Sequence, residues 1–259
     1  MKNMINNRFL LFEYFNTANT KDSNADIAKY ILENHESLVS DSLNHISKSS
    51  YFSQPTLSRF FLNTCASSIE EYKKGDFISN LKAKNLIAEQ ISQIKTYDSL
   101  KEELSSSFEE VLNIDEKTIK STLKLLGNSN RILFIGHSPL QQFAYPLQTI
   151  LTCNSKAAFA PLNYDMQEKL ISEMSENDLI FVHTVSESWL QNEIVYSLKE
   201  KLSACTSKKI LISFDSITHT EDIKNSTKII LGKNAIPFGE VQVLLFYKIL
   251  SILYAEKDL

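Results

Sequence analysis

The sequence has few glycines, few cysteines and no excess of positive charge. Five glycines in 259 residues fall far below the usual share of about 7%. Any phosphate-binding loop must therefore contain fewer glycines than such loops usually have. The cysteines at positions 65, 153 and 205 are scattered, a spacing that predicts neither disulfides nor a metal site and suits a cytoplasmic protein. A net charge of −4 excludes the class of proteins dominated by a highly basic tail.

Long apolar segments are also missing. The longest apolar stretch, residues 241–254, is interrupted by Lys248 and is too short to span a bilayer. The N-terminus carries no basic-then-apolar signal segment, so we expect no membrane partner. The length and an apolar fraction of 43% are typical of a globular protein with two modest cores.

Residues 51–60 predict a capped helix with one polar and one apolar face. Ser53 is placed to accept hydrogen bonds from backbone N–H groups two or three residues later, and Pro55 falls in the first turn, where it needs no donor. Leu57, Phe60 and Phe61 share the apolar face. The candidate DNA-contacting residues are polar groups suited to base edges and phosphates: Ser53, Gln54, Thr56, Ser58 and Arg59. An ordinary amphipathic surface helix explains this segment about as well.

The residues upstream favour the DNA-binding interpretation. Helices are predicted at residues 24–35 and 41–47, and a fourth short helix at residues 68–74. Short helices joined tightly in this way give the helix-turn-helix layout. The charge argues in the other direction, because residues 1–78 contain eight Lys or Arg and nine Asp or Glu. Since phosphate neutralisation supplies most non-specific DNA affinity, we expect weak binding for each monomer.

Residues 26–73 resemble the N-terminal domain of RpiR-type transcriptional regulators. The matching residues are Ile27, Ala28, Ile31 and Leu32, then Ser42, Leu43 and Ile46, then Ser53, Thr56, Leu57, Arg59 and Phe60, and finally Tyr72 and Lys73. Two positions depart from the family pattern. Cys65 stands in a region where the family usually has glycine, and Pro55 stands where a small residue is usual. The resemblance implies a helix-turn-helix domain at residues 1–78 that binds a double-stranded DNA operator.

From residue 115 onward the pattern alternates between helix and strand. Short apolar runs at residues 131–136, 178–182, 209–214 and 228–231 predict buried strands separated by helices. The fold class is therefore an α/β/α doubly wound parallel sheet that follows an all-α domain. We expect residues 79–105 to form a helical linker and residues 106–259 to form the sheet domain. Ligands in such sheets bind beyond the carboxyl ends of the strands.

Two loops occupy that position. Hydroxyl groups and free N–H groups at a helix start suit a phosphate, and the histidines can add hydrogen bonds; the candidate ligand-binding residues are His137, Ser138, His183, Thr184 and Ser186. The arrangement resembles the sugar isomerase (SIS) domain of RpiR-type regulators, which implies a phosphosugar effector. Glu187 replaces the usual glycine, and Trp189 replaces the usual threonine. An altered ligand that is uncharged or carries an amine stays open, as do capped strand ends that bind no ligand.

Three functions fit these patterns. The first is a regulator of carbohydrate metabolism that senses a phosphosugar and has no catalytic residues. The second is a phosphosugar isomerase, with His137, His183 or Glu187 as candidate bases. The third is a degenerate regulator that dimerises but binds neither DNA nor sugar well. No carboxylate or cysteine lies at metal-ligand spacing near the two histidines, so we expect no metal and no cofactor. The apolar final helix predicts a homodimer through the second domain.

Overall fold

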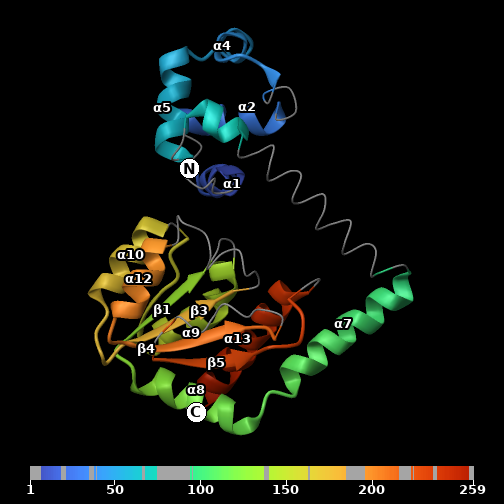
Figure 1. Cartoon of the computed structure of the whole chain (residues 1–259), viewed down its shortest axis with the longest axis vertical. Coiled ribbons are helices and arrows are strands. Elements are labelled where there is room, and N and C mark those ends of the chain that lie inside the picture. Colours follow the sequence, from blue (N-terminus) through green and yellow to red (C-terminus); the bar gives the residue numbers. More distant parts are fainter. Residues whose placement is uncertain are drawn as a thin grey trace. The chain divides into compact units, whose positions relative to one another are not determined.

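A computed structural model describes residues 7–18, 22–34, 38, 40–65, 68–74, 94, 96–136, 140–162, 164–184, 196–215, 223, 225–235 and 238–256. The chain divides into two compact units, Met1–Ser92 and Gln93–Leu259. Figure 1 shows the helices of the first unit and the sheet of the second. Each unit is described by itself.

The first unit is helical. It contains α1 (Asn7–Thr17), α2 (Ser23–Glu33), α4 (Leu43–Ser50) and α5 (Gln54–Thr64), and residues 69–74 are also helical. The three helices predicted from residues 24, 41 and 68 are present, with ends shifted by a few residues, whereas α1 was not predicted. The apolar faces meet in one core formed by residues that include Leu11, Ile27, Ile31, Ile46, Leu57, Phe60, Phe61 and Tyr72.

Side-chain caps fix where these helices begin. The Ser42 hydroxyl accepts from the His45 amide at 3.2 Å and starts α4, and the Ser53 hydroxyl accepts from the Thr56 amide at 3.3 Å and starts α5. Each bond satisfies a backbone donor that the first helical turn leaves unpaired. Between the two helices, Tyr51 takes a left-handed backbone conformation with φ 61°. The connection from α4 to α5 is therefore only three residues long.

The second unit contains a five-stranded parallel sheet in the order β2-β1-β3-β4-β5. Its strands are β1 (Arg131–Gly136), β2 (Ala157–Phe159), β3 (Leu179–His183), β4 (Lys208–Ser213) and β5 (Ser226–Ile230). From β1 the chain adds β2 on one side and then β3, β4 and β5 on the other, so the order of strand addition switches sides between β1 and β3. The expected α/β fold with a parallel sheet is confirmed for this unit.

Helices cover both faces of the sheet (Figure 1). The described helices of this unit are α7 (Tyr97–Leu112), which packs on α13, and α8 (Glu116–Asn128), α9 (Tyr145–Cys153), α10 (Tyr164–Glu173), α12 (Tyr196–Ala204) and α13 (Gly239–Glu256). Alternate strand residues point to opposite faces. Ile132 and Phe134 therefore pack with α8, α9 and α13, whereas Leu133 and Ile135 pack with α10 and α12. This alternation produces two apolar cores, one on each side of the sheet.

Several element ends differ from the prediction. Gly127 was expected to end a helix, but α8 continues to Asn128. The helix expected at residues 141–151 is instead a 3₁₀ helix, η1 (Leu140–Ala144), followed by α9. Residues 97–105, expected as the last part of a helical linker, form the beginning of α7, which starts at a Thr96 capping box. The helix start expected near Ser188 lies outside the described residues. Within the described chain, each helix is too short or too polar to cross a bilayer.

Candidate functional site

The polar face of α5 is the first candidate site. Ser53, Gln54 and Arg59 are exposed, and Thr56 and Ser58 are half-buried, while the apolar face of the same helix is buried in the core of the first unit. All five predicted DNA-contacting residues therefore reach the surface of this unit. The sequence pattern of α5 was sufficient to separate its two faces.

Hydrogen bonds arrange this polar face before any ligand binds. The hydroxyl groups of Ser53 and Thr56 lie 2.8 Å apart. Gln54 Nε2 donates to Asn44 Oδ1 on α4 at 3.3 Å, and Arg59 Nε donates to the Pro55 carbonyl at 3.4 Å. Ser53 also caps the helix, so its hydroxyl is already engaged. Gln54 and Arg59 carry more N–H groups than these bonds use, so they are the more available donors.

Tyr51 is a feature of this site that the sequence reasoning missed. Its side chain is 95% exposed in the turn between α4 and α5. An aromatic ring at that exposure gains no burial free energy, and the left-handed backbone adds a cost that glycine would avoid. The only sequence signal was a large aromatic residue between two predicted helices.

The cations around the polar face do not all point to solvent. Lys48, Arg59 and Lys74 are exposed. Lys73 is half-buried, and its ammonium group donates to the Asp41 carbonyl just before α4. One of the four cations in or beside the motif therefore holds the helical segment 69–74 against α4, which reduces the charge left for a phosphate backbone.

The carboxyl edge of the sheet is the second candidate site. Gly136 ends β1 and pairs with His183, which ends β3. His183 in turn pairs with Ile212 of β4, and the Thr184 amide donates to the Ile212 carbonyl at 3.1 Å. These residues lie where the strand order reverses, which is the position at which sheets of this order bind ligands. The structure thus places His183 and Thr184 at the expected edge.

His183 is an enclosed, neutral histidine. Its side chain is fully buried, and its Nδ1 lies 3.1 Å from the Tyr247 hydroxyl on α13. Burial lowers the pKa of His183 to about 3, because desolvation disfavours the imidazolium. Its Nε2 has no hydrogen-bond partner among the described residues. His183 can therefore donate or accept one hydrogen bond, but it brings no positive charge to a phosphate.

Uncharged polar side chains lie at the ends of β1 and β4. The Gln167 side chain makes two hydrogen bonds to the backbone of Gly136. Its Oε1 accepts from the Gly136 amide at 3.3 Å, and its Nε2 donates to the Gly136 carbonyl at 3.2 Å. Gln141 Nε2 donates to the same carbonyl. In the described part of the chain, Gln141 Oε1 and the Ser213 hydroxyl are buried without a partner. Sequence reasoning missed all three residues, since an isolated Gln or Ser gives no pattern.

The remaining predicted ligand-binding residues, His137, Ser138 and Ser186, lie outside the described residues. Glu187 and Trp189, the two departures from the SIS pattern, also lie outside them. Across the ranges that the structure describes, no cluster of three or more His, Cys, Asp or Glu side chains is placed to hold a metal ion.

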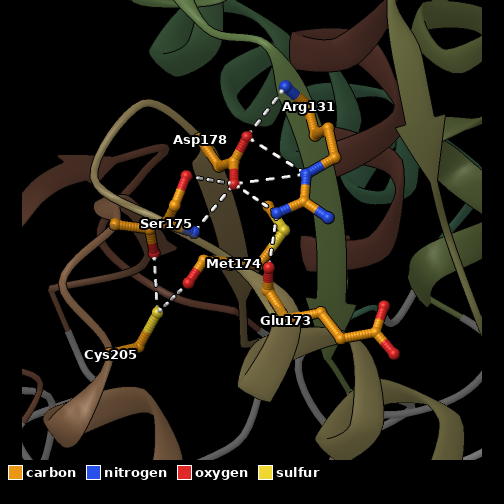
Figure 2. Close-up of polar contacts among 7 residues, drawn as sticks. Arg131, Glu173, Met174, Ser175, Asp178 and Cys205 are labelled. Atoms are coloured by element: carbon orange, nitrogen blue, oxygen red, sulfur yellow. Dashed lines mark hydrogen bonds and ion pairs between the residues drawn. The ribbon is translucent and has the colours of Figure 1, made fainter.

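The opposite, amino edge of the sheet is held by a buried carboxylate. Asp178 accepts from Arg131 Nη2 at 2.7 Å, from the Arg131 amide at 3.1 Å and from the Ser175 amide at 2.7 Å (Figure 2). Burial alone raises the pKa of Asp178, but the hydrogen bonds from Arg131 and Ser175 outweigh it and lower the pKa overall. Arg131 also donates to the Glu173 carbonyl. This network ties β1 to the turn before β3 and has a structural role.

Comparisons with known proteins give distant structural similarities. No protein-family model matches the chain, and no curated protein sequence matches it. NanR of Vibrio vulnificus, solved with ManNAc-6P, is 16% identical, with 96% of this chain and 90% of that chain covered and a TM-score of 0.48. The sugar isomerase domain of an RpiR transcription factor from Sphaerobacter thermophilus is 9% identical, with coverages of 67% and 89% and a TM-score of 0.47.

A phosphoheptose isomerase from Francisella tularensis is 16% identical, with 62% of this chain and 98% of that chain covered and a TM-score of 0.49. With TM-scores below 0.5, these similarities assign neither a family nor a function to this chain.

Proposed function

We propose that this protein is a ligand-responsive DNA-binding regulator. In this proposal α4 and α5 form a helix-turn-helix, and the second unit binds a phosphosugar at the carboxyl edge of its sheet. The observation that carries the proposal is the geometry of α5: a Ser53-capped helix follows α4 after three residues and buries Leu57, Phe60 and Phe61. Its polar face remains at the surface. A recognition helix needs this division between a packed face and a polar face.

The polar chemistry of α5 suits a nucleic acid. Gln54 can pair with an adenine edge, and Arg59 can pair with a guanine edge or a phosphate. The helix N-terminus adds backbone N–H groups that can hold a phosphate oxygen. Because few cations surround the motif, we expect modest affinity for each monomer, raised when two copies bind a palindromic site.

The homodimer is proposed to form through α13. Val241, Leu244 and Ile252 on this helix are partly exposed, while its other side is buried against the sheet. A second copy would remove this apolar surface from water. Analytical ultracentrifugation at tens of micromolar tests the point, and a strictly monomeric profile would contradict it.

The carboxyl edge is polar but uncharged. His183, Gln141 and Ser213 each have a side-chain atom without a hydrogen-bond partner among the described residues, and all three are fully buried, so a sugar hydroxyl would reach them only where binding exposes them. The phosphate would be held by the hydroxyl-bearing loops that follow β1 and β3. Thr184 lies at the beginning of the second loop.

The isomerase alternative loses one of its candidate bases. A general base works best with a pKa near the operating pH, whereas the pKa of His183 is lowered to about 3 and its side chain is enclosed. His183 is therefore a poor general base at neutral pH. The other two candidate bases, His137 and Glu187, lie outside the described residues.

DNA binding is tested by fluorescence anisotropy with the protein's own promoter DNA at 50 and 150 mM salt. Arg59→Ala should weaken binding severalfold and reduce the salt slope by about 1. Lys29→Ala is the matched control, because Lys29 is an exposed cation on α2 outside the motif. The proposal fails if micromolar protein gives no salt-sensitive binding, or if both variants behave alike.

Ligand binding is tested by thermal shift with fructose 6-phosphate and N-acetylmannosamine 6-phosphate, compared with the unphosphorylated sugars. A ligand at about 100 times its Kd stabilises the folded state by about 2.7 kcal/mol. Thr184→Val should reduce the shift, and Thr227→Val, an exposed change of the same kind on β5, should not. Equal shifts with and without phosphate would argue against a phosphosugar.

A further inference from the structure

We infer that ligand binding at the carboxyl edge is transmitted to α7 through a hydrogen-bonded junction. The inference rests on the proposed function and names the route by which that site is coupled to the rest of the chain. The α7 junction consists of Ser107 and Glu110 on α7, residues 231–233 after β5, and Gln242 on α13. These parts are joined although more than 120 residues separate Ser107 and Glu110 from the other two in sequence.

Gln242 is the centre of the α7 junction. Its Nε2 donates to the Ser107 carbonyl at 3.0 Å and to Glu110 Oε2 at 3.1 Å, and it lies 3.5 Å from the Leu231 carbonyl. Glu110 Oε1 also accepts from the Lys233 amide at 3.3 Å. One buried amide group thus holds α7 and the segment after β5 together.

The second half of the route connects residues 231–233 to the candidate ligand site. The Leu231 amide donates to the Ser213 carbonyl at 3.0 Å, and the Asp215 amide donates to the Gly232 carbonyl at 3.0 Å. Ser213 ends β4. The residue before it, Ile212, pairs with His183, and the Ile212 carbonyl accepts from the Thr184 amide. A shift of the β4 end therefore moves residues 231–233 directly.

Two features make the junction sensitive to a small shift. The Gln242 amide has two protons for three nearby carbonyl or carboxylate acceptors, while its own Oε1 is buried without a partner among the described residues. Gly232 packs so closely that a Cβ on it would collide with Glu110 Oε2 and lie 2.7 Å from Gln242 Nε2. The bonds are thus redistributed when residues 231–233 move, because there is no surplus of donors and the ends of the Glu110 and Gln242 side chains must move with Gly232.

Helix α7 is well placed to relay such a change. It is the first described helix of the second unit, and the first unit ends at Ser92. Only Ser107 and Val111 of its sixteen residues are buried, and Leu100, Leu104 and Phe108 are half-buried. The junction hydrogen bonds therefore add to a modest apolar contact in attaching this helix. A ligand that alters them changes the equilibrium position of the helix through which the chain enters this unit.

The first arm of the test needs no ligand. Amide hydrogen exchange of α7 is measured in the full-length wild type, in Glu110→Ala and in Gly232→Ala. Both variants should raise exchange in α7 severalfold. The controls are Glu109→Ala, an exposed change of the same kind on the next residue, and Gly127→Ala, whose Cβ meets no atom within 4 Å. Unchanged α7 exchange in both junction variants overturns the inference whatever the function proves to be.

The second arm measures coupling. DNA affinity is determined with and without 5 mM N-acetylmannosamine 6-phosphate and, separately, 5 mM fructose 6-phosphate. In the wild type at least one should change DNA affinity by about fivefold or more, whereas Glu110→Ala should keep both separate affinities and lose the fold-change. Full coupling in Glu110→Ala overturns the junction while the proposed function stands. If neither sugar phosphate binds the wild type, the proposed function fails and the inference falls with it.

Discussion

Gly136 and His183 lie side by side at the ends of β1 and β3, so closely that only a glycine fits. A Cβ added to Gly136 would lie 2.5 Å from His183 Cδ2 and 2.7 Å from the His183 carbonyl oxygen. The imidazole therefore fills the space that a side chain on β1 would need. This contact explains the glycine at the strand end, and together with Tyr247 it encloses His183.

Gly136→Ala should destabilise the protein by about 1–3 kcal/mol, since the strand must shift to relieve a backbone contact. Urea unfolding measures the change. Gly127→Ala is the control: its Cβ meets no atom within 4 Å, and alanine in a helix is favoured over glycine by up to about 1 kcal/mol. Equal midpoints for the two variants would contradict the steric argument.

The buried His183 should make stability depend on pH between about 6.5 and 3. The imidazole is neutral in both states above pH 6.5, the usual pKa of an unfolded histidine. Below pH 6.5 the imidazole becomes protonated in the unfolded chain, whereas in the folded protein it stays neutral down to about pH 3. Stability therefore falls on acidification by up to about 1.4 kcal/mol per pH unit.

The measurement is urea unfolding at pH 7 and pH 5, where most carboxylates are still ionised. The wild type should lose about 2 kcal/mol more between these pH values than His183→Gln does. A wild-type slope in His183→Gln would show that another group is responsible.

Local sequence signals predicted most of the sheet unit. Parallel strands buried on both faces require continuous apolar runs, and the runs at residues 131–136, 178–182 and 209–214 match β1, β3 and β4 to within one residue at each end. Ser53 was predicted as a helix cap because its partner is three residues away. Signals of this kind are contained within a few consecutive residues.

The parts that could not be predicted depend on contacts between distant residues. Gln167 meets Gly136 from 31 residues away, and Gln242 meets Glu110 from 132 residues away. A lone glutamine has the same local pattern in a core as on a surface. Gly127 was taken as a helix end because glycine usually ends helices, but apolar packing of Leu123 and Leu126 carries α8 past it.

Asp178→Asn should destabilise the protein by about 2 kcal/mol. The carboxylate accepts from Arg131 and Ser175, and an asparagine would turn an NH₂ group toward these donors. Removing one partner of a buried pair costs about 3–5 kcal/mol, which we reduce because Arg131 is 35% exposed. Asp98→Asn removes an exposed pair with Lys101 and should change stability by less than about 0.5 kcal/mol. Similar losses in both variants would refute the structural role of Asp178.

The three cysteines should react with Ellman's reagent at very different rates. Cys153 is exposed and should react first in the folded protein at pH 8. Cys65 is fully buried, and burial raises the pKa of its thiol to about 12, so almost no thiolate exists there and the reagent is excluded. Cys205 is half-buried beside the Ser207 hydroxyl at 3.1 Å and should react at an intermediate rate. Cys153→Ser should remove the fast phase of the reaction. Cys65→Ser should remove the phase that appears only on unfolding. A fast phase that persists in Cys153→Ser would show that a second thiol lies at the surface.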